Sequence, residues 1–121
     1  MAEGISAAGA NTPLDAIRTD TPFIQLHVGA PGASGTANVA TETTRKAVTF
    51  GAASGGSMTN TAQVQWTSIA GSQDATHFTI WNASSAGTFK FSGTITANAY
   101  TAGDTYTAAV SAITLSITVA S

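Results

Sequence analysis

The sequence of 121 residues contains no cysteine and very little charge. Without cysteine, neither a disulfide nor a cysteine-ligated zinc site can stabilise the fold. Charged residues make up 8% of the chain, against roughly 25% in a typical soluble domain. The chain has only four basic residues. They cannot neutralise the roughly six to ten phosphates that a typical nucleic-acid binder contacts. Stability must therefore come from packing, and nucleic acid is excluded as a partner.

Long apolar segments are missing as well. No apolar run approaches the roughly 20 residues of a membrane-spanning helix. The N-terminus, MAEGISAAGANT, has neither the basic start nor the apolar stretch of a signal peptide. We therefore expect no membrane insertion and no export by that route. The length fits one domain.

The shortage of charge also bears on assembly. β-rich monomers usually protect their exposed strand edges with lysine, glutamate or proline, and this chain has few of these residues. We therefore predict that other subunits cover its edges, in a homo-oligomer.

What is present begins with a helical signal in NTPLDAIRTD. Thr12 is suited to the N-cap, Pro13 to the first helical position, and Asp15 to the acidic position of a capping box. The pattern predicts a short helix of two turns, within an N-terminal arm of residues 1–22. A helix so short needs Leu14 and Ile17 to pack on another element.

From residue 23 onwards apolar and polar residues alternate with period two, as in half-buried strands. The Gly-rich stretches GAPGASGTAN and GAASGGSMTN and the short connection ASSAG, with Gly87 at positive φ, separate the strands. The predicted strands are residues 23–28, 45–50, 63–67, 76–82, 88–96, 105–110 and 112–119. Seven or eight short strands at this spacing predict an all-β, jelly-roll-like antiparallel sandwich over residues 23–121.

The segment SQDATHFTIWNAS places Asp74 and His77 near three serines, Ser72, Ser84 and Ser85. A hydroxyl nucleophile needs a histidine within hydrogen-bond range. Ser84 lies seven residues from His77, about 23 Å along an extended strand, and no G-x-S-x-G elbow is present. The pattern favours a strand-end histidine over a catalytic group, and we predict no enzyme.

Metal and phosphate sites find equally little support. His27 and His77 could ligate a metal together with Asp74 or Glu42 only if their strands were neighbours. The glycine runs are not followed by a lysine and a helix, as a phosphate cradle requires, and Asp104 lacks further carboxylates for calcium. We predict no metal and no cofactor.

The strand 76–82 is apolar on both faces. Phe78 and Ile80 share one face, and His77, Thr79 and Trp81 share the other. One face joins the core, so Trp81 must be covered by a loop, by the helix or by another protein; tryptophan is a frequent interface anchor. The candidate interface residues are Trp81, Phe23, His27 and Tyr100.

The chain also resembles a family of small bacteriophage tail fibre or minor tail proteins, common in phages of actinobacteria. The resemblance lies in FIQLHVGAPGASGTAN, in the strand Arg45 to Phe50, in GAASGGSMTNTAQVQWT, in THFTIWNASSAGTFKFSGTIT and in AGDTYTAAVSAITLSI, and covers roughly residues 23–117. The N-terminal 22 residues depart from it. The family has no enzymatic activity.

The resemblance implies a virion structural protein, assembled in the host cytoplasm, that binds copies of itself, as in a trimer, and other phage structural proteins. A tail component is the leading interpretation, and a capsid decoration protein is the alternative. A third interpretation is a receptor-recognition module in which Trp66, Trp81 or Tyr100 stacks on a host-surface glycan; exposed aromatic rings would favour it.

Overall fold

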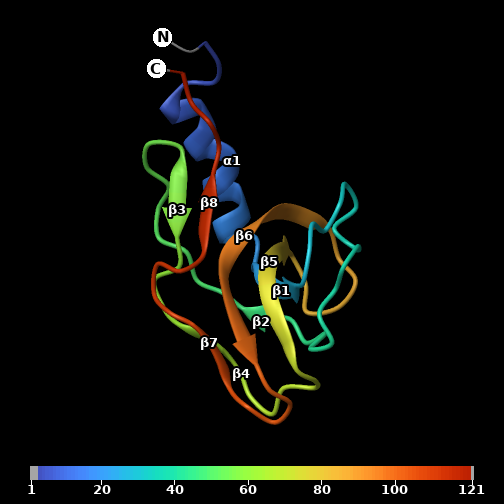
Figure 1. Cartoon of the computed structure of the whole chain (residues 1–121). Helices are drawn as coiled ribbons and strands as arrows, with labels where there is room; N and C mark the ends of the chain where they lie inside the picture. Colours follow the sequence, from blue (N-terminus) through green and yellow to red (C-terminus); the bar gives the residue numbers. More distant parts are fainter. Residues whose placement is uncertain (1–2, 121) are drawn as a thin grey trace.

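The computed structural model describes residues 3–120, with the backbone alone at residues 96–98 (Figure 1). Within this range the chain has one helix and eight strands. They are α1 (Ala7–Thr19), β1 (Phe23–His27), β2 (Lys46–Ala47), β3 (Ser57–Thr59), β4 (Val64–Trp66), β5 (Gln73–Trp81), β6 (Phe89–Tyr100), β7 (Tyr106–Ala108) and β8 (Thr114–Ser116). The predicted all-β class is confirmed. Over the residues described, no helix has the length and apolar character needed to cross a membrane.

All the strands pair antiparallel, in one larger sheet and two ribbons. The larger sheet has the order β2-β1-β5-β6, and the ribbons are β3-β8 and β4-β7. The second layer of the sandwich is thus two separate two-stranded ribbons.

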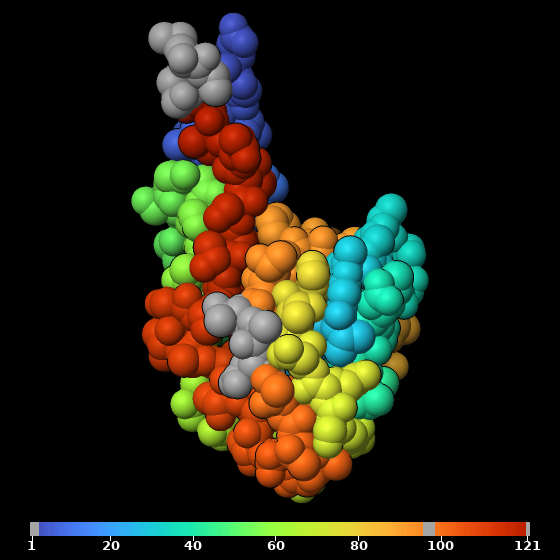
Figure 2. Space-filling view, in the orientation of Figure 1, coloured from blue at the N-terminus to red at the C-terminus, as the bar shows by residue number. Residues whose placement is uncertain are grey.

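The molecule has a body and a projection. In Figure 1, α1 lies beside β3 and β8 and extends away from the sheet, and both ends of the chain lie at its tip. Figure 2 shows the same helix and the C-terminal segment standing out from the body. The two ends pair there: Ile5 forms a parallel bridge with Val119, and the Ala120 N–H donates to the Ile5 carbonyl at 2.7 Å.

One face of the larger sheet carries the core. Ile24 and Leu26 of β1 lie opposite Ile80 and Phe78 of β5, and all four are fully buried. Residues from the helix and the ribbons pack with them, among them Leu14, Met58, Val64, Trp66, Ile113 and Leu115. The period-two alternation of the sequence produces this face directly, because alternate side chains of a strand point the same way.

The predicted start of the helix was wrong. Helix α1 begins at Ala7, its N-cap is Ser6, whose hydroxyl accepts from the Gly9 N–H at 3.0 Å, and Pro13 lies inside it. An internal proline removes one helical hydrogen bond. Docking explains why the helix persists, since Ala10 and Leu14, four residues apart, are both fully buried.

Several strand boundaries also differ from the prediction. GAASGGSMTN was read as a break, yet residues 57–59 form β3, because Met58 packs in the core and its strand pairs with β8. The strand predicted at 45–50 is reduced to β2 and a bridge from Phe50 to Asn60. β5 and β6 are longer than predicted, and Gly87 has the expected positive φ, 76°.

The buried residue Asn60, between β3 and β4, joins its own segment to the segment between β7 and β8. Asn60 is 1% exposed. Its side-chain amide donates to the Ala62 and Ala109 carbonyls, both at 2.9 Å, and its oxygen accepts from the Ile113 N–H at 2.9 Å. One side chain therefore satisfies three backbone groups.

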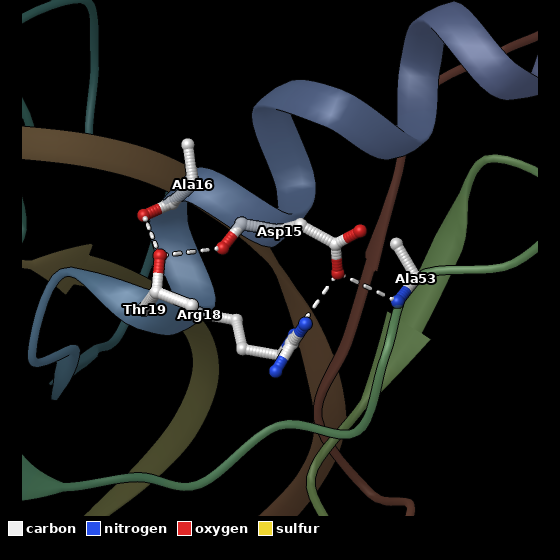
Figure 3. A network of polar contacts seen from close by, with 5 residues as sticks. All are labelled: Asp15, Ala16, Arg18, Thr19 and Ala53. Carbon is white, nitrogen blue, oxygen red and sulfur yellow. Dashed lines mark hydrogen bonds and ion pairs between the residues drawn. The ribbon is translucent and has the colours of Figure 1, made fainter.

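Helix α1 is attached to residues 51–56 by two polar side chains on one face. The Asp15 carboxylate accepts from the Ala53 N–H at 3.0 Å and from the Arg18 Nε–H at 2.9 Å, as Figure 3 shows. One turn earlier, the Asn11 oxygen accepts from the Gly56 N–H at 2.9 Å. These bonds fix the helix against the loop that leads into β3.

Replacing Asn60 by alanine should destabilise the fold by about 3 kcal/mol, because it leaves buried backbone groups without partners. Urea unfolding should give a lower midpoint with an unchanged slope. The exposed Gln63 provides the control, and Gln63→Ala should stay near the wild type. Equal stability of Asn60→Ala and Gln63→Ala would contradict this role.

Asp15 should add an acid-sensitive contribution to stability. The Ala53 N–H first, and Arg18 second, lower the pKa of this carboxyl below its ordinary 3.8. A folded-state pKa below the unfolded one gives stability that is present above about pH 4 and is lost as the pH falls further. Asp15→Ala should remove this dependence and speed hydrogen exchange at Ala53, whereas the exposed Asp74→Ala should leave both unchanged. If the Ala53 amide stays as protected in Asp15→Ala as in the wild type, the attachment is not as inferred.

Candidate functional site: the Trp81 face of the sheet

The second face of the larger sheet holds most of the residues that the sequence singles out. The register of β1 and β5 sets Phe23 opposite Trp81, Gln25 opposite Thr79, and His27 opposite His77. Phe89 of β6 lies opposite Trp81. We call this the Trp81 face, made of Phe23, Gln25, His27, His77, Thr79, Trp81 and Phe89.

A β-bulge puts Phe89 on this face. Ile80 pairs with Phe91 and Trp81 pairs with Phe89, so β6 uses one extra residue between these two pairs. Phe91 consequently packs against the core, and the Phe89 ring lies 5.5 Å from the Trp81 ring. Strict alternation along β6 would instead place Phe89 and Phe91 on the same face.

Trp81, Thr79 and His27 form a buried chain of hydrogen bonds. The Trp81 Nε1–H donates to the Thr79 hydroxyl at 2.7 Å, and that hydroxyl lies 2.9 Å from His27 Nε2. His27 Nδ1 lies 2.8 Å from the Ala37 carbonyl. Because a carbonyl can only accept, Nδ1 carries the proton, and Nε2 accepts from the Thr79 hydroxyl. Each group in the chain has a partner when His27 is neutral.

The environment of His27 favours this neutral form. The side chain is fully buried. Burial lowers the pKa of His27 below 6.5, and the neighbouring His77 acts in the same direction, against the opposing hydrogen bond with the Ala37 carbonyl.

A loop of small residues covers the Trp81 face. Residues 38–40 pair with the end of β1, through the Val28 N–H to the Asn38 carbonyl and the Ala40 N–H to the Leu26 carbonyl. The loop between them crosses to β6, where Gly35 lies on the Phe89 ring. A Cβ on Gly35 would be 2.7 Å from Phe89 Cδ1, and its φ is 71°. Glycine is therefore required at this crossing.

Arg45 covers Trp81 from the other side. Its guanidinium carbon lies 4.0 Å from the centre of the indole ring. Arg45 Nη1 also donates to the Ala83 and Ala86 carbonyls, at 3.1 Å and 2.6 Å. Trp81 is 7% exposed. Its own chain thus supplies covering for this residue, with Arg45 on one face of the indole and the Phe89 ring beside it.

The structure does not bring His77, Asp74 and a serine together as a hydrolytic site would require. His77 Nδ1 bonds to the Thr76 hydroxyl at 2.9 Å, and the Ser72 hydroxyl accepts from the Ala102 N–H. Ser84 and Ser85 follow the far end of β5. Asp74 is exposed and lies opposite Ala99.

The structure places the two histidines considered as metal ligands side by side, but nitrogens of both rings and the Glu42 carboxylate are already hydrogen-bonded. His27 and His77 do pair across the strands, yet both ring nitrogens of His27 are engaged. Glu42 accepts from the Thr44 and Ala70 N–H groups, at 3.2 Å and 3.1 Å. Among residues 3–120 no three acidic or histidine side chains gather as a metal would need.

The bonds of Glu42 show a role that the sequence had not indicated. This carboxylate is 7% exposed and joins residues 42–44 to residues 69–70 through two N–H donors. Burial raises the pKa of Glu42, but these hydrogen bonds outweigh it and the net shift is downward. No local pattern marks such a residue, because its partners lie in different loops.

Three further aromatic residues, Trp66, Tyr100 and Tyr106, form a cluster on the core side. Tyr106 lies between Trp66 and Tyr100, with ring centres 5.7 Å and 5.6 Å apart. Trp66 donates to the Thr44 carbonyl, and the Tyr100 hydroxyl has no partner among the residues described. Trp66, Trp81 and Tyr100 are 0%, 7% and 6% exposed. None of these three rings offers the open face that stacking on a sugar requires.

Comparison with known proteins decides the family. The family model described as podophage GP4 fiber I protein gp80 matches residues 6–116. The chain belongs to this phage fibre family. The match begins at Ser6, so it includes helix α1, which the sequence resemblance had left outside. A search of curated proteins finds no match.

Membership makes the chain a phage tail fibre protein and a component of the virion. The family's matched range contains the whole Trp81 face together with Arg45 and the Gly-rich loop. In this fibre protein the face is packed, and its polar side chains form hydrogen bonds to one another, to the neighbouring Thr76 hydroxyl or to the backbone.

Arg45→Ala should uncover Trp81 and destabilise the fold by about 2 kcal/mol, the sum of a partly desolvated cation–π contact and charged hydrogen bonds. Arg45→Lys should lose less, since it keeps the charge but not the planar fork. Thermal unfolding and acrylamide quenching of tryptophan fluorescence measure the two effects, with Lys46→Ala as the control. Unchanged quenching in Arg45→Ala would show that another group covers the indole.

Proposed function

We propose that this protein is a structural, non-enzymatic subunit of a phage tail fibre, and that it acts by self-association and by attachment to other virion proteins. The family match over residues 6–116 carries the proposal. The condition of the candidate reactive groups supports it, because His27, Glu42 and Ser72 are each engaged in hydrogen bonds that hold the fold.

The composition of the chain supports the proposed self-association. The chain has ten charged residues, four basic and six acidic, and two of its ion pairs already use four of them: Arg18 with Asp15, and Lys90 with Asp20. Few charges remain to protect exposed strand edges from another copy. A homotrimer assembled in the host cytoplasm and incorporated into the virion is the arrangement we propose.

A capsid decoration protein is the competing proposal, since a small β domain with a projecting helix would also suit a capsid lattice. The two differ in copy number: hundreds of copies per particle for decoration, and a small number for a fibre. A glycan-binding role would need residues other than Trp66, Trp81 and Tyr100, because these are buried.

Quantification of the chain in purified virions, together with immunogold labelling, should test the location. We expect a low copy number and label at the tail. Label spread over the capsid would overturn the fibre proposal in favour of decoration.

Light scattering of the purified chain should test self-association separately. We expect an oligomer, and a stable monomer at high concentration would contradict it.

His77→Ala should assemble as the wild type does, as expected if His77 has no catalytic role.

A further inference from the structure

His27 is an unusual residue to bury in a protein that has only two histidines. It is fully inaccessible, and both of its ring nitrogens bond to uncharged partners, the Ala37 carbonyl and the Thr79 hydroxyl. One of these partners belongs to the covering loop and the other to the sheet. His27 therefore joins the loop to the face that the loop covers.

The loop has few other means of attachment. Residues 29–37 are GAPGASGTA, without a charged or large apolar side chain. Turn bonds hold it internally, such as the Ala37 N–H to the Pro31 carbonyl at 2.9 Å. Its contacts with the sheet include the crossing of Gly35 over Phe89 and the bond from His27. Pro31 and Gly35 are buried, but the other residues of the loop are exposed or only partly buried. The loop therefore buries little apolar surface, and the loss of one buried hydrogen bond matters.

A proton on His27 Nε2 would disturb the hydrogen-bond chain. The neutral ring accepts the Thr79 hydroxyl hydrogen, whereas a protonated ring must donate. Thr79 would then accept from both Trp81 and His27, and its own hydrogen would lose its acceptor. The added charge would also lie in a site without access to water, which is costly.

The charged groups around this site make the cost larger. On β5, His77 lies directly opposite His27, and the one acid of that strand, Asp74, is exposed. From the segment before β2, Arg45 lies over Trp81. On β6, Lys90 is paired with Asp20. Residues 28–41 contain no charge at all.

We propose that His27 is an acid-sensitive latch, whose protonation releases the loop 29–37 from the Trp81 face while the core of the fold stays formed. The released state uncovers the Phe89 ring, on which Gly35 lies, and so opens one side of the Phe89–Trp81 aromatic pair. Aromatic residues of this kind are frequent at protein contacts. The buried, neutral histidine keeps the loop closed at neutral pH. Opening grows as the pH falls below about 6.5, because the open state then binds the proton that the closed state excludes.

Hydrogen exchange followed by NMR on the intact chain tests the latch. The Val28 and Ala40 amides and the Trp81 indole N–H report on the loop and its face. The Ile113 and Gly51 amides and the Trp66 indole N–H report on the core. Between pH 7.5 and 5, we expect protection factors of the first group to fall by up to about tenfold per pH unit, with those of the second group unchanged.

Two variants sharpen the test. His27→Gln cannot gain the charge, so the loop group should lose its dependence on pH even if its protection is lower throughout. His77→Gln removes the ionisable ring opposite His27, which lowers the pKa of His27. The opening should then move to lower pH, because His27 is protonated more easily inside the closed state. If His27→Gln does not fold, the wild-type exchange still decides.

Equal loss of protection in both groups would overturn the latch, since it would mean global unfolding. Unchanged protection of the loop group down to pH 4.5 would overturn it as well. So would a pH dependence that survives in His27→Gln.

Discussion

Strand β5 must be covered on both faces, and the rest of the structure follows from this constraint. Phe78 and Ile80 on one face and Thr79 and Trp81 on the other are all buried. A chain of 121 residues cannot build two full layers around one sheet. The helix and the two ribbons cover the first face, and the second is covered more thinly, by a loop of small residues and by Arg45.

Polar side chains that bind the backbone replace the ion pairs of a more highly charged protein. Asn60, Glu42, Asp15 and Asn11 each accept from backbone N–H groups of a segment distant in sequence. A bond to a buried backbone group satisfies a donor that would otherwise cost free energy, and it is screened by salt less than a surface ion pair. A fibre protein that must persist in the virion without disulfides gains from joints of this kind.

The thinly covered face is also where the fold can change. The covering loop contacts Phe89 through Gly35, and its Ala37 carbonyl is hydrogen-bonded to His27 of the sheet. The opposite face instead packs against large apolar side chains. The part of the fibre protein most relevant to function is therefore the Trp81 face, together with the loop 29–37 that covers it. The same segment that first suggested a catalytic group, SQDATHFTIWNAS, forms the centre of that packed face.

The sequence by itself determined the all-β class, the position of β1 and of the β5–β6 hairpin, and the two-sided apolar character of residues 76–82, because these depend on alternation and turn residues within short windows. It did not reveal that α1 starts at Ala7 and contains Pro13, that residues 57–59 form a strand, or that a bulge sends Phe89 and Phe91 to opposite faces. It also left open whether Trp81 meets another protein or its own chain. These features depend on partners far away in sequence, such as Ala53 for Asp15, β8 for Met58 and Arg45 for Trp81. Only the tertiary structure brings such partners together, since their contact energies outweigh the local preferences that a sequence pattern reports.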